Sequence, residues 1–225
     1  MNAKLSLICL LLTVQFFFAK AFAQTAHSNL TIVYDISIKK TKHSTGIEET
    51  YNGGTKVIFI NGQKARIRMV SLMRIESVFF DYDTSTLKKA TVIKESGAKK
   101  YLFKLDAEGW KNYNSKYLEA TCDSLNDSIM IAGYNCKKAI VNLPSGEKID
   151  VYYTDRLKTE NNLIEPAFSC IPGTVLQYQH STNRGVITFT ASQVSTDTIA
   201  KDIFIIPSKG VEIRQHLSQK SKGQL

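Results

Sequence analysis

The chain has 225 residues, with 29 Lys and Arg against 20 Asp and Glu. That length suits one domain with a sizeable core and is short for two. A positive surplus would favour nucleic acid as the partner of a cytoplasmic protein, but the N-terminal residues indicate export and argue against that class. Anionic lipid head groups, lipopolysaccharide or an acidic protein surface remain as partners. The simpler alternative is that the Lys side chains decorate solvent faces and strand edges.

Residues 1–23 have the pattern of a signal peptide. Lys4 supplies a positive start, Leu5 to Phe18 run almost unbroken apolar, and Ala21-Phe22-Ala23 matches a small-x-small cleavage site. The apolar run is shorter than the roughly 20 residues that span a bilayer. We therefore expect one periplasmic or secreted domain over residues 24–225, peripheral to a membrane at most.

Alternating apolar residues predict strands through most of this domain. Leu30 to Ile38 alternate with polar residues, as expected when one sheet face is buried, and Asn61-Gly62 between two apolar runs predicts a tight hairpin. The predicted strands cover 30–38, 57–60, 64–70, 77–82, 90–94, 100–105, 117–121, 129–143, 148–154, 175–180, 185–194 and 202–207. Long strands in sequence order predict a mainly β fold, a single curved antiparallel sheet of half-barrel form.

Two connections interrupt this pattern. Residues 107–116 are polar and predict a loop or a single helical turn. Residues 158–171 lack clear periodicity, and long loops of this kind in a compact domain often cover an opening. From Ser208 the tail is rich in Lys and Gln, and we expect it to fray.

Three cysteines follow the predicted cleavage site, which allows one disulfide with one free thiol, or none. A turn at 123–127 would place Cys122 opposite about Ile129 and Cys136 roughly 23 Å further along the strand. That separation is too long for a bridge. Cys170 lies in a loop and could reach either partner, and we favour Cys122–Cys170.

The stretch from Ile129 to Ile206 carries a recognisable series of motifs. It contains I-M-I-A-G-Y-N-C-K-K-A-I-V, G-E-K-I-D-V-Y-Y-T, I-P-G-T-V-L-Q-Y and I-F-I-I-P in that order. This series resembles the GLPGLI family of uncharacterised exported Bacteroidetes proteins. The full G-L-P-G-L-I string is absent, so the resemblance extends equally to a close sister family. The motif residues are Gly133, Tyr134, Cys136, Lys137, Lys138 and Ala139, followed by Pro172 and Gly173. The resemblance implies an outline like the lipoprotein carrier LolA, a curved sheet around a covering helix or loop, and it implies no established activity.

The same residues also have a purely structural explanation. Gly133 inside the predicted strand 129–143 would mark a bulge or bend. Pro172-Gly173 would form a sharp turn that leads the long loop into the strand at Val175.

Motifs for catalysis are missing from the sequence. It contains no H-E-x-x-H, G-x-S-x-G, Walker loop or C-x-x-C, and Asp150, Asp155, Glu147 and Glu165 show no paired spacing. Cys136 and His180 would act as nucleophile and base only if the fold joined them, and we favour a structural cysteine. We predict no catalytic site, no metal site and no cofactor.

Two functions remain, with a hydrolase using an unrecognised site as a distant third. The first is a non-catalytic envelope binding protein that holds a lipid, acyl chain or lipidated protein in the concave face of the sheet. The candidate ligand-binding residues are Tyr134, Ile140, Val151, Tyr153, Phe168, Ile171 and Phe189, with Lys137, Lys138 and Lys209 for anionic head groups. Alternatively, the sheet's own side chains fill that face, namely Ile131, Tyr134, Ile140, Val151, Tyr153, Phe189 and Phe204. The second function is an envelope structural or protein-interaction module without a small-molecule ligand.

Overall fold

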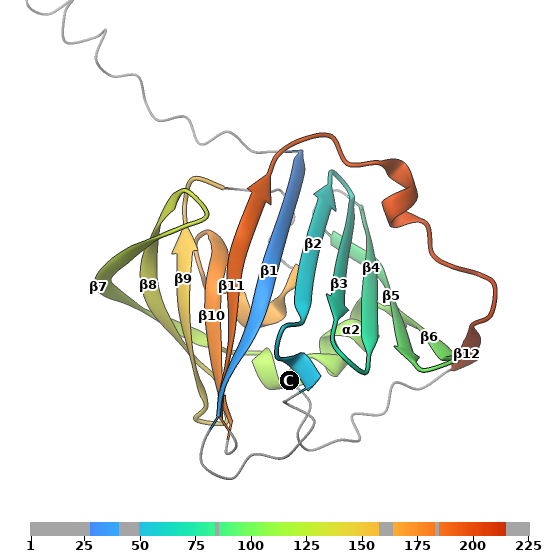
Figure 1. The fold of residues 1–225 in the computed structure, drawn as a ribbon, viewed down its shortest axis with the longest axis horizontal. Coiled ribbons are helices and arrows are strands. Elements are labelled where there is room, and N and C mark those ends of the chain that lie inside the picture. The colour runs from blue at the N-terminus through green and yellow to red at the C-terminus, as the bar shows by residue number, and fades with distance from the viewer. Residues whose placement is uncertain (1–27, 41–49, 84–85, 158–163, 183–184, 215–225) are drawn as a thin grey trace, which may run out of the picture.

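A computed structural model describes residues 28–40, 50–83, 86–157, 164–182 and 185–214. The predicted signal peptide lies outside these residues. All strands of the described part form one curved sheet of 12 strands that does not close into a barrel, which confirms the predicted fold class (Figure 1). The strands are β1 (Asn29–Lys40), β2 (Thr55–Asn61), β3 (Lys64–Val70), β4 (Ile75–Asp83), β5 (Thr86–Ser96), β6 (Lys99–Asp106), β7 (Thr121–Ile131), β8 (Tyr134–Asn142), β9 (Lys148–Thr154), β10 (Thr174–Thr182), β11 (Gly185–Ser195) and β12 (Glu212–Arg214).

The sheet consists of two antiparallel meanders joined by the first strand. The order is β12-β6-β5-β4-β3-β2-β1-β11-β10-β9-β8-β7. Strands β2 to β6 and β7 to β11 are each in sequence order, as predicted. Strand β1 pairs with β2 on one side and with β11 on the other. Of the described strands, only β12 is parallel to its neighbour, β6.

Two hairpins show where the chain turns tightly. The predicted β2–β3 hairpin is present, with Asn61 paired to Lys64 and with φ of 52° at Gly62. The predicted long strand 129–143 was wrong, because a two-residue turn at Ala132-Gly133 divides it into β7 and β8. Both turn residues have positive φ, 47° and 83°, the requirement of a tight hairpin. The predicted turn at 123–127 is instead an irregularity within β7.

Helical elements lie against the concave face, the face that carries Tyr34 and Ile58. The helix α2 (Ala107–Tyr113) replaces the predicted loop or single turn, because the Asp106 side chain accepts a hydrogen bond from the Gly109 backbone N–H at 2.7 Å. The 3-10 helix η2 (Ser115–Tyr117) follows, so the strand predicted to start at Tyr117 begins only at Thr121. A further 3-10 helix, η4 (Pro166–Phe168), belongs to the predicted covering loop. Figure 1 shows α2 behind β2–β4, inside the curve of the sheet.

The C-terminal segment crosses the outer, convex face. The strand predicted over 202–207 was wrong: the 3-10 helix η5 (Lys201–Phe204) occupies this stretch and is followed by β12. Ile206 and Val211 pack on a small cluster of Phe79, Ile93 and Leu102, which holds the segment up to Arg214 against the sheet. The rest of the tail that was expected to fray, residues 215–225, lies outside the described residues. Phe204 is only partly buried and lies outside the main core cluster. The expectation that it helps to fill the concave face was therefore wrong.

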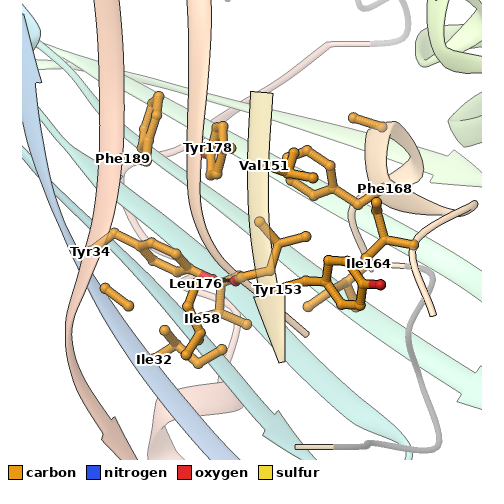
Figure 2. Close-up of a cluster of buried hydrophobic side chains, with 14 of the residues drawn as sticks. Ile32, Tyr34, Ile58, Val151, Tyr153, Ile164, Phe168, Leu176, Tyr178 and Phe189 are labelled. Atoms are coloured by element: carbon orange, nitrogen blue, oxygen red, sulfur yellow. Dashed lines mark hydrogen bonds between the residues drawn. The ribbon is translucent and has the colours of Figure 1, made fainter. Parts of the chain in front are cut away.

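The main core lies under the concave face and extends across both meanders. Its buried members include Ile32, Tyr34, Ile58, Val151 and Leu176 (Figure 2). No helix of the described residues is long and apolar enough to cross a membrane.

Candidate functional site

A cavity of about 640 Å³ lies between the concave face and its helical cover. Strands β2 to β6, β10 and β11 form its floor, and residues from α2, η2 and η4 form its cover. The lining residues are Tyr51, Lys56, Ile67, Met69, Arg74, Ile75, Glu76, Val78, Lys94, Glu95, Ser96, Tyr101, Trp110, Tyr113, Asn114, Lys116, Tyr117, Ile164, Glu165, Pro166, Ala167, Phe168, Tyr178, His180 and Phe189.

Aromatic side chains form much of the apolar wall. The Trp110 ring from α2 meets Phe80 edge-on, with centroids 5.1 Å apart, and contacts Tyr113 at 5.8 Å. Trp110 is buried, and its Nε1 has no hydrogen-bond partner among the described residues. Phe168 from η4 contacts Tyr178 at 4.9 Å, so the cover and the sheet meet through aromatic rings.

Charged residues gather along one row of the sheet. The strand register places Lys56, Met69, Glu76, Lys94 and Tyr101 side by side on β2 to β6. Lys94 Nζ donates to Tyr113 Oη at 3.3 Å and lies 3.4 Å from a Glu76 oxygen. Burial lowers the pKa of Lys94, but Glu76 and Tyr113 outweigh burial and raise it. Glu76 and Lys94 are partly exposed whereas Val78 and Trp110 are buried, so this part of the charged row faces solvent.

Lys56 is the most unusual residue of this row, because its charged side chain is only 5% exposed. Its Nζ donates to Tyr178 Oη at 3.0 Å and forms an ion pair with Glu165. It also lies over three rings, at 5.2 Å from Tyr34, 4.9 Å from Tyr178 and 5.8 Å from Phe189. Figure 2 shows these three rings on neighbouring strands.

The aromatic groups around Lys56 stay neutral at physiological pH. Burial, and then the Glu165 carboxylate, raise the pKa of Tyr178 and of Tyr34 well above the ordinary range of tyrosine. The Tyr34 hydroxyl donates to the Val175 carbonyl at 2.7 Å. His180 stacks edge-on against Tyr178 at 5.6 Å, and burial together with the charges of Lys116 and Lys56 lowers its pKa to about 4. At neutral pH neutral rings therefore surround the pair of Lys56 and Glu165.

The structure divides the seven candidate ligand-binding residues into three groups. Phe168 and Phe189 line the cavity. Val151, Tyr153 and Ile171 are buried in the core cluster, and Tyr134 is partly buried against it. The expectation for Ile140 was wrong, because it pairs with Asp150 on the face opposite Ala139 and Val151. A one-residue offset along a strand reverses the face.

Several residues that line the cavity were not predicted from the sequence. Glu165 was named only among the carboxylates that show no paired spacing, and Lys56, Trp110 and Tyr178 were not singled out. A signal for Lys56 existed, because it shares the period of two with Ile58 and Ile60, which marks a charged residue on a buried face.

The family-motif residues lie away from the cavity lining. Lys137 pairs with Asp155 at 2.8 Å, and Lys138 lies 5.7 Å from the Tyr152 ring. Cys136 is buried, its Sγ donates to the Tyr134 carbonyl, and burial raises its pKa to about 11. A thiol in that state is a poor nucleophile. Lys209 is exposed on the C-terminal segment.

Pro172-Gly173 makes the turn into β10, which begins at Thr174. A Cβ on Gly173 would lie 2.3 Å from the Thr154 carbonyl oxygen, so the close approach of the two backbones requires glycine.

A disulfide joins Cys122 of β7 to Cys170, with Cα atoms 5.8 Å apart. This is the favoured pairing, although Cys122 lies opposite Val141 rather than Ile129 because the hairpin turn is elsewhere. The bridge fixes the end of the cover segment, Ile164–Ile171, to the edge of the sheet. Among the described residues, no group of three or more His, Cys, Asp and Glu is placed to hold a metal ion.

Comparisons with known proteins concern the fold. No family model and no curated protein matches the chain. A solved structure of PNGF-II in space group P21 is similar, with a TM-score of 0.50 and 16% identity over 84% of this chain, and the C2 form has a TM-score of 0.49 and 15% identity. The chain spans about a third of the length of PNGF-II, 32% and 31% respectively. An uncharacterised conserved protein from Thermus thermophilus matches 90% of this chain and 99% of its own length, with a TM-score of 0.47 and 6% identity.

Proposed function

We propose that this protein is a non-catalytic binding protein that holds a ligand with an acyl chain in the cavity on its concave face. The observation that carries this proposal is the cavity itself. Its volume of about 640 Å³ lies within the range of roughly 300–1,000 Å³ that small-molecule sites occupy. Its walls include aromatic and aliphatic side chains, and its charged groups lie along one row, from the buried Lys56 to the partly exposed Glu76 and Lys94, which suits an amphiphile.

Burial of an acyl chain supplies a large part of the binding energy. Each buried methylene contributes about 0.8 kcal/mol, so roughly ten methylenes contribute about 8 kcal/mol, from which the entropy of association is still to be subtracted. Head-group contacts must therefore add to the affinity.

We further propose that the protein acts outside the cytoplasm, in the periplasm or as a secreted protein of the cell envelope. Two features support this. Residues 1–23 have a signal-peptide pattern, and the Cys122–Cys170 disulfide is of a kind that persists in oxidising compartments. Cell fractionation followed by N-terminal sequencing tests this location, with Gln24 as the expected first residue. Full-length protein in the cytosol would contradict it. Membership of the GLPGLI family stays a prediction from the motif residues.

Native mass spectrometry with lipid extraction tests the binding function. We expect protein from a bacterial periplasm to carry a species of several hundred daltons that extraction removes. Ile67→Trp, which places a large ring in the cavity, should lower the bound fraction. Arg68→Trp is the matched control, because Arg68 is the next residue of β3 and lies on the other face. A bare mass for the unaltered protein would contradict the proposal.

One observation favours the alternative of a protein-interaction module. Strand β7 forms an edge of the sheet and exposes Leu125 by 40%, Ile129 by 36% and Met130 by 67%. A strand from a partner protein could pair with this edge. Capture of an envelope protein by the unaltered chain, lost in Met130→Lys, would support that function.

A further inference from the structure

The charged row of the cavity, and the buried Lys56 in it, indicates what head group the ligand has. We propose that the ligand is an amphiphile with a carboxylate head, and that this head binds Lys56 in place of the Glu165 carboxylate. The proposal assumes that the cavity is a ligand site, as proposed above, and adds the chemistry of the head.

Lys56 provides a cation that must have an anion beside it. Its side chain is 5% exposed, and its other close neighbours are the Tyr178 hydroxyl and three aromatic rings. An ammonium group at this depth is strongly destabilised unless a negative charge compensates for lost hydration. In the structure the carboxylate of Glu165 provides this negative charge.

Glu165 belongs to the cover and not to the sheet, so its carboxylate can be replaced without disturbing the strands. Its side chain is 20% exposed, four times the exposure of Lys56. It stands at the N-cap of η4 but makes no capping bond with its side chain. The helix is held instead by the Phe168 N–H bond to the Glu165 backbone oxygen at 3.0 Å and by the burial of Ala167 and Phe168. The carboxylate can therefore rotate away from Lys56 while η4 stays in place.

The charges of the cavity lining favour a single added negative charge. Four lining residues are basic (Lys56, Arg74, Lys94 and Lys116) and three are acidic (Glu76, Glu95 and Glu165). His180 is neutral at pH 7, since its pKa lies at about 4. One carboxylate brings the lining to neutrality, whereas a phosphate head, with a charge of roughly −2, overshoots it.

The apolar tail has a place in the same arrangement. From Lys56 the next inward-facing residues along the sheet are Ile58 on β2, Ile67 on β3 and Val78 on β4, and both Ile67 and Val78 line the cavity. A chain whose carboxylate contacts Lys56 can therefore follow the sheet along Ile67 and Val78 towards Trp110, which also lines the cavity.

Calorimetric titration of the purified protein with dodecanoate, dodecyl phosphate and dodecanol tests the head group, because the three probes share one tail. We expect dodecanoate to bind roughly tenfold or more tightly than dodecanol and more tightly than dodecyl phosphate. Lys56→Met should abolish the preference for dodecanoate over dodecanol. Lys104→Met is the control: Lys104 is an exposed lysine of β6 outside the cavity lining, so this variant should keep the preference.

Glu165→Gln gives a second test that does not depend on replacing a buried lysine. It preserves the shape of the side chain and weakens the competitor, so the affinity for dodecanoate should rise several-fold while that for dodecanol stays unchanged.

The outcomes separate the two proposals. If none of the probes binds, the cavity is not a ligand site and both proposals fail. If dodecanoate and dodecanol bind equally, or dodecyl phosphate binds best, the carboxylate proposal is overturned and the binding function stands. If Glu165→Gln leaves the affinity for dodecanoate unchanged, Glu165 does not occupy the head-group site.

Discussion

The protonation of His180 makes the stability of the protein depend on pH in a defined direction. Burial, aided by Lys116 and Lys56, lowers its pKa from 6.5 to about 4 in the folded state. At a pH between these two pKa values, His180 is protonated in the unfolded chain and neutral in the folded protein. The stability that this group contributes is therefore complete above pH 6.5 and is lost as the pH falls towards 4. The difference in pKa corresponds to roughly 3 kcal/mol at most, and less where solvent reaches the partly exposed ring.

Urea unfolding of the unaltered protein and of His180→Gln, at about pH 7 and about pH 4.5, measures this effect. Between these two conditions we expect the unaltered protein to lose about 2 kcal/mol more of its unfolding free energy than the variant does. Asp155, whose pKa is lowered by its hydrogen bond with Lys137, also loses stability in acid, but it does so equally in both proteins and cancels in the difference. Equal losses in the two proteins would refute the idea that the fold excludes a protonated His180.

Three other changes have sizes that follow from the structure. Replacing Cys122 and Cys170 by Ser opens a loop of 48 residues and should lower the unfolding free energy by about 4 kcal/mol. Urea unfolding of this variant and of the oxidised protein measures the loss, and an unchanged midpoint would contradict the bridge. Gly173→Ala places a methyl group 2.3 Å from the Thr154 carbonyl oxygen and should lower the unfolding free energy by at least about 2 kcal/mol. In the control Gly210→Ala the new methyl group meets no atom within 4 Å, so the unfolding free energy should fall by only about 1 kcal/mol, because of the positive φ at this position. Trp110→Ala removes a ring that is 8% exposed and should destabilise the protein by about 3–5 kcal/mol in thermal unfolding; a loss below about 1 kcal/mol would show that α2 does not pack firmly on the sheet.

The strands were predictable from the sequence because a period of two reflects a local requirement, one buried and one solvated face. Where the prediction was wrong, a longer-range contact or an unrecognised turn decided the structure. The turn at Ala132-Gly133 lacks the Asn-Gly signal, so the two strands on either side of it looked like one. The helix α2 is polar over most of its length, and it forms because Asp106 caps it and Trp110 packs on Phe80.

The candidate site was harder to predict than the fold. Phe168 and Phe189 could be chosen because large apolar residues near a curved sheet tend to face inward. The pair of Lys56 and Glu165 could not, because 109 positions separate the two residues and only the folded chain brings a charge of each sign to one place. The stacking of Tyr178 on Phe189 depends likewise on the register of β10 and β11.

The place of β1 in the sheet has a consequence for how the chain reaches its native state. The first strand lies at the centre of the sheet, and its partner β11 is the last strand but one. The Tyr34 hydroxyl of β1 likewise donates to the carbonyl of Val175 in β10, a residue 141 positions later in the chain. Each meander can form from neighbouring residues, but the two cannot join until nearly the whole chain is present. Pairing over such distances is slow, on the order of milliseconds to seconds. The sheet of such a chain therefore stays incomplete, with strand edges unpaired, until β11 has been synthesised.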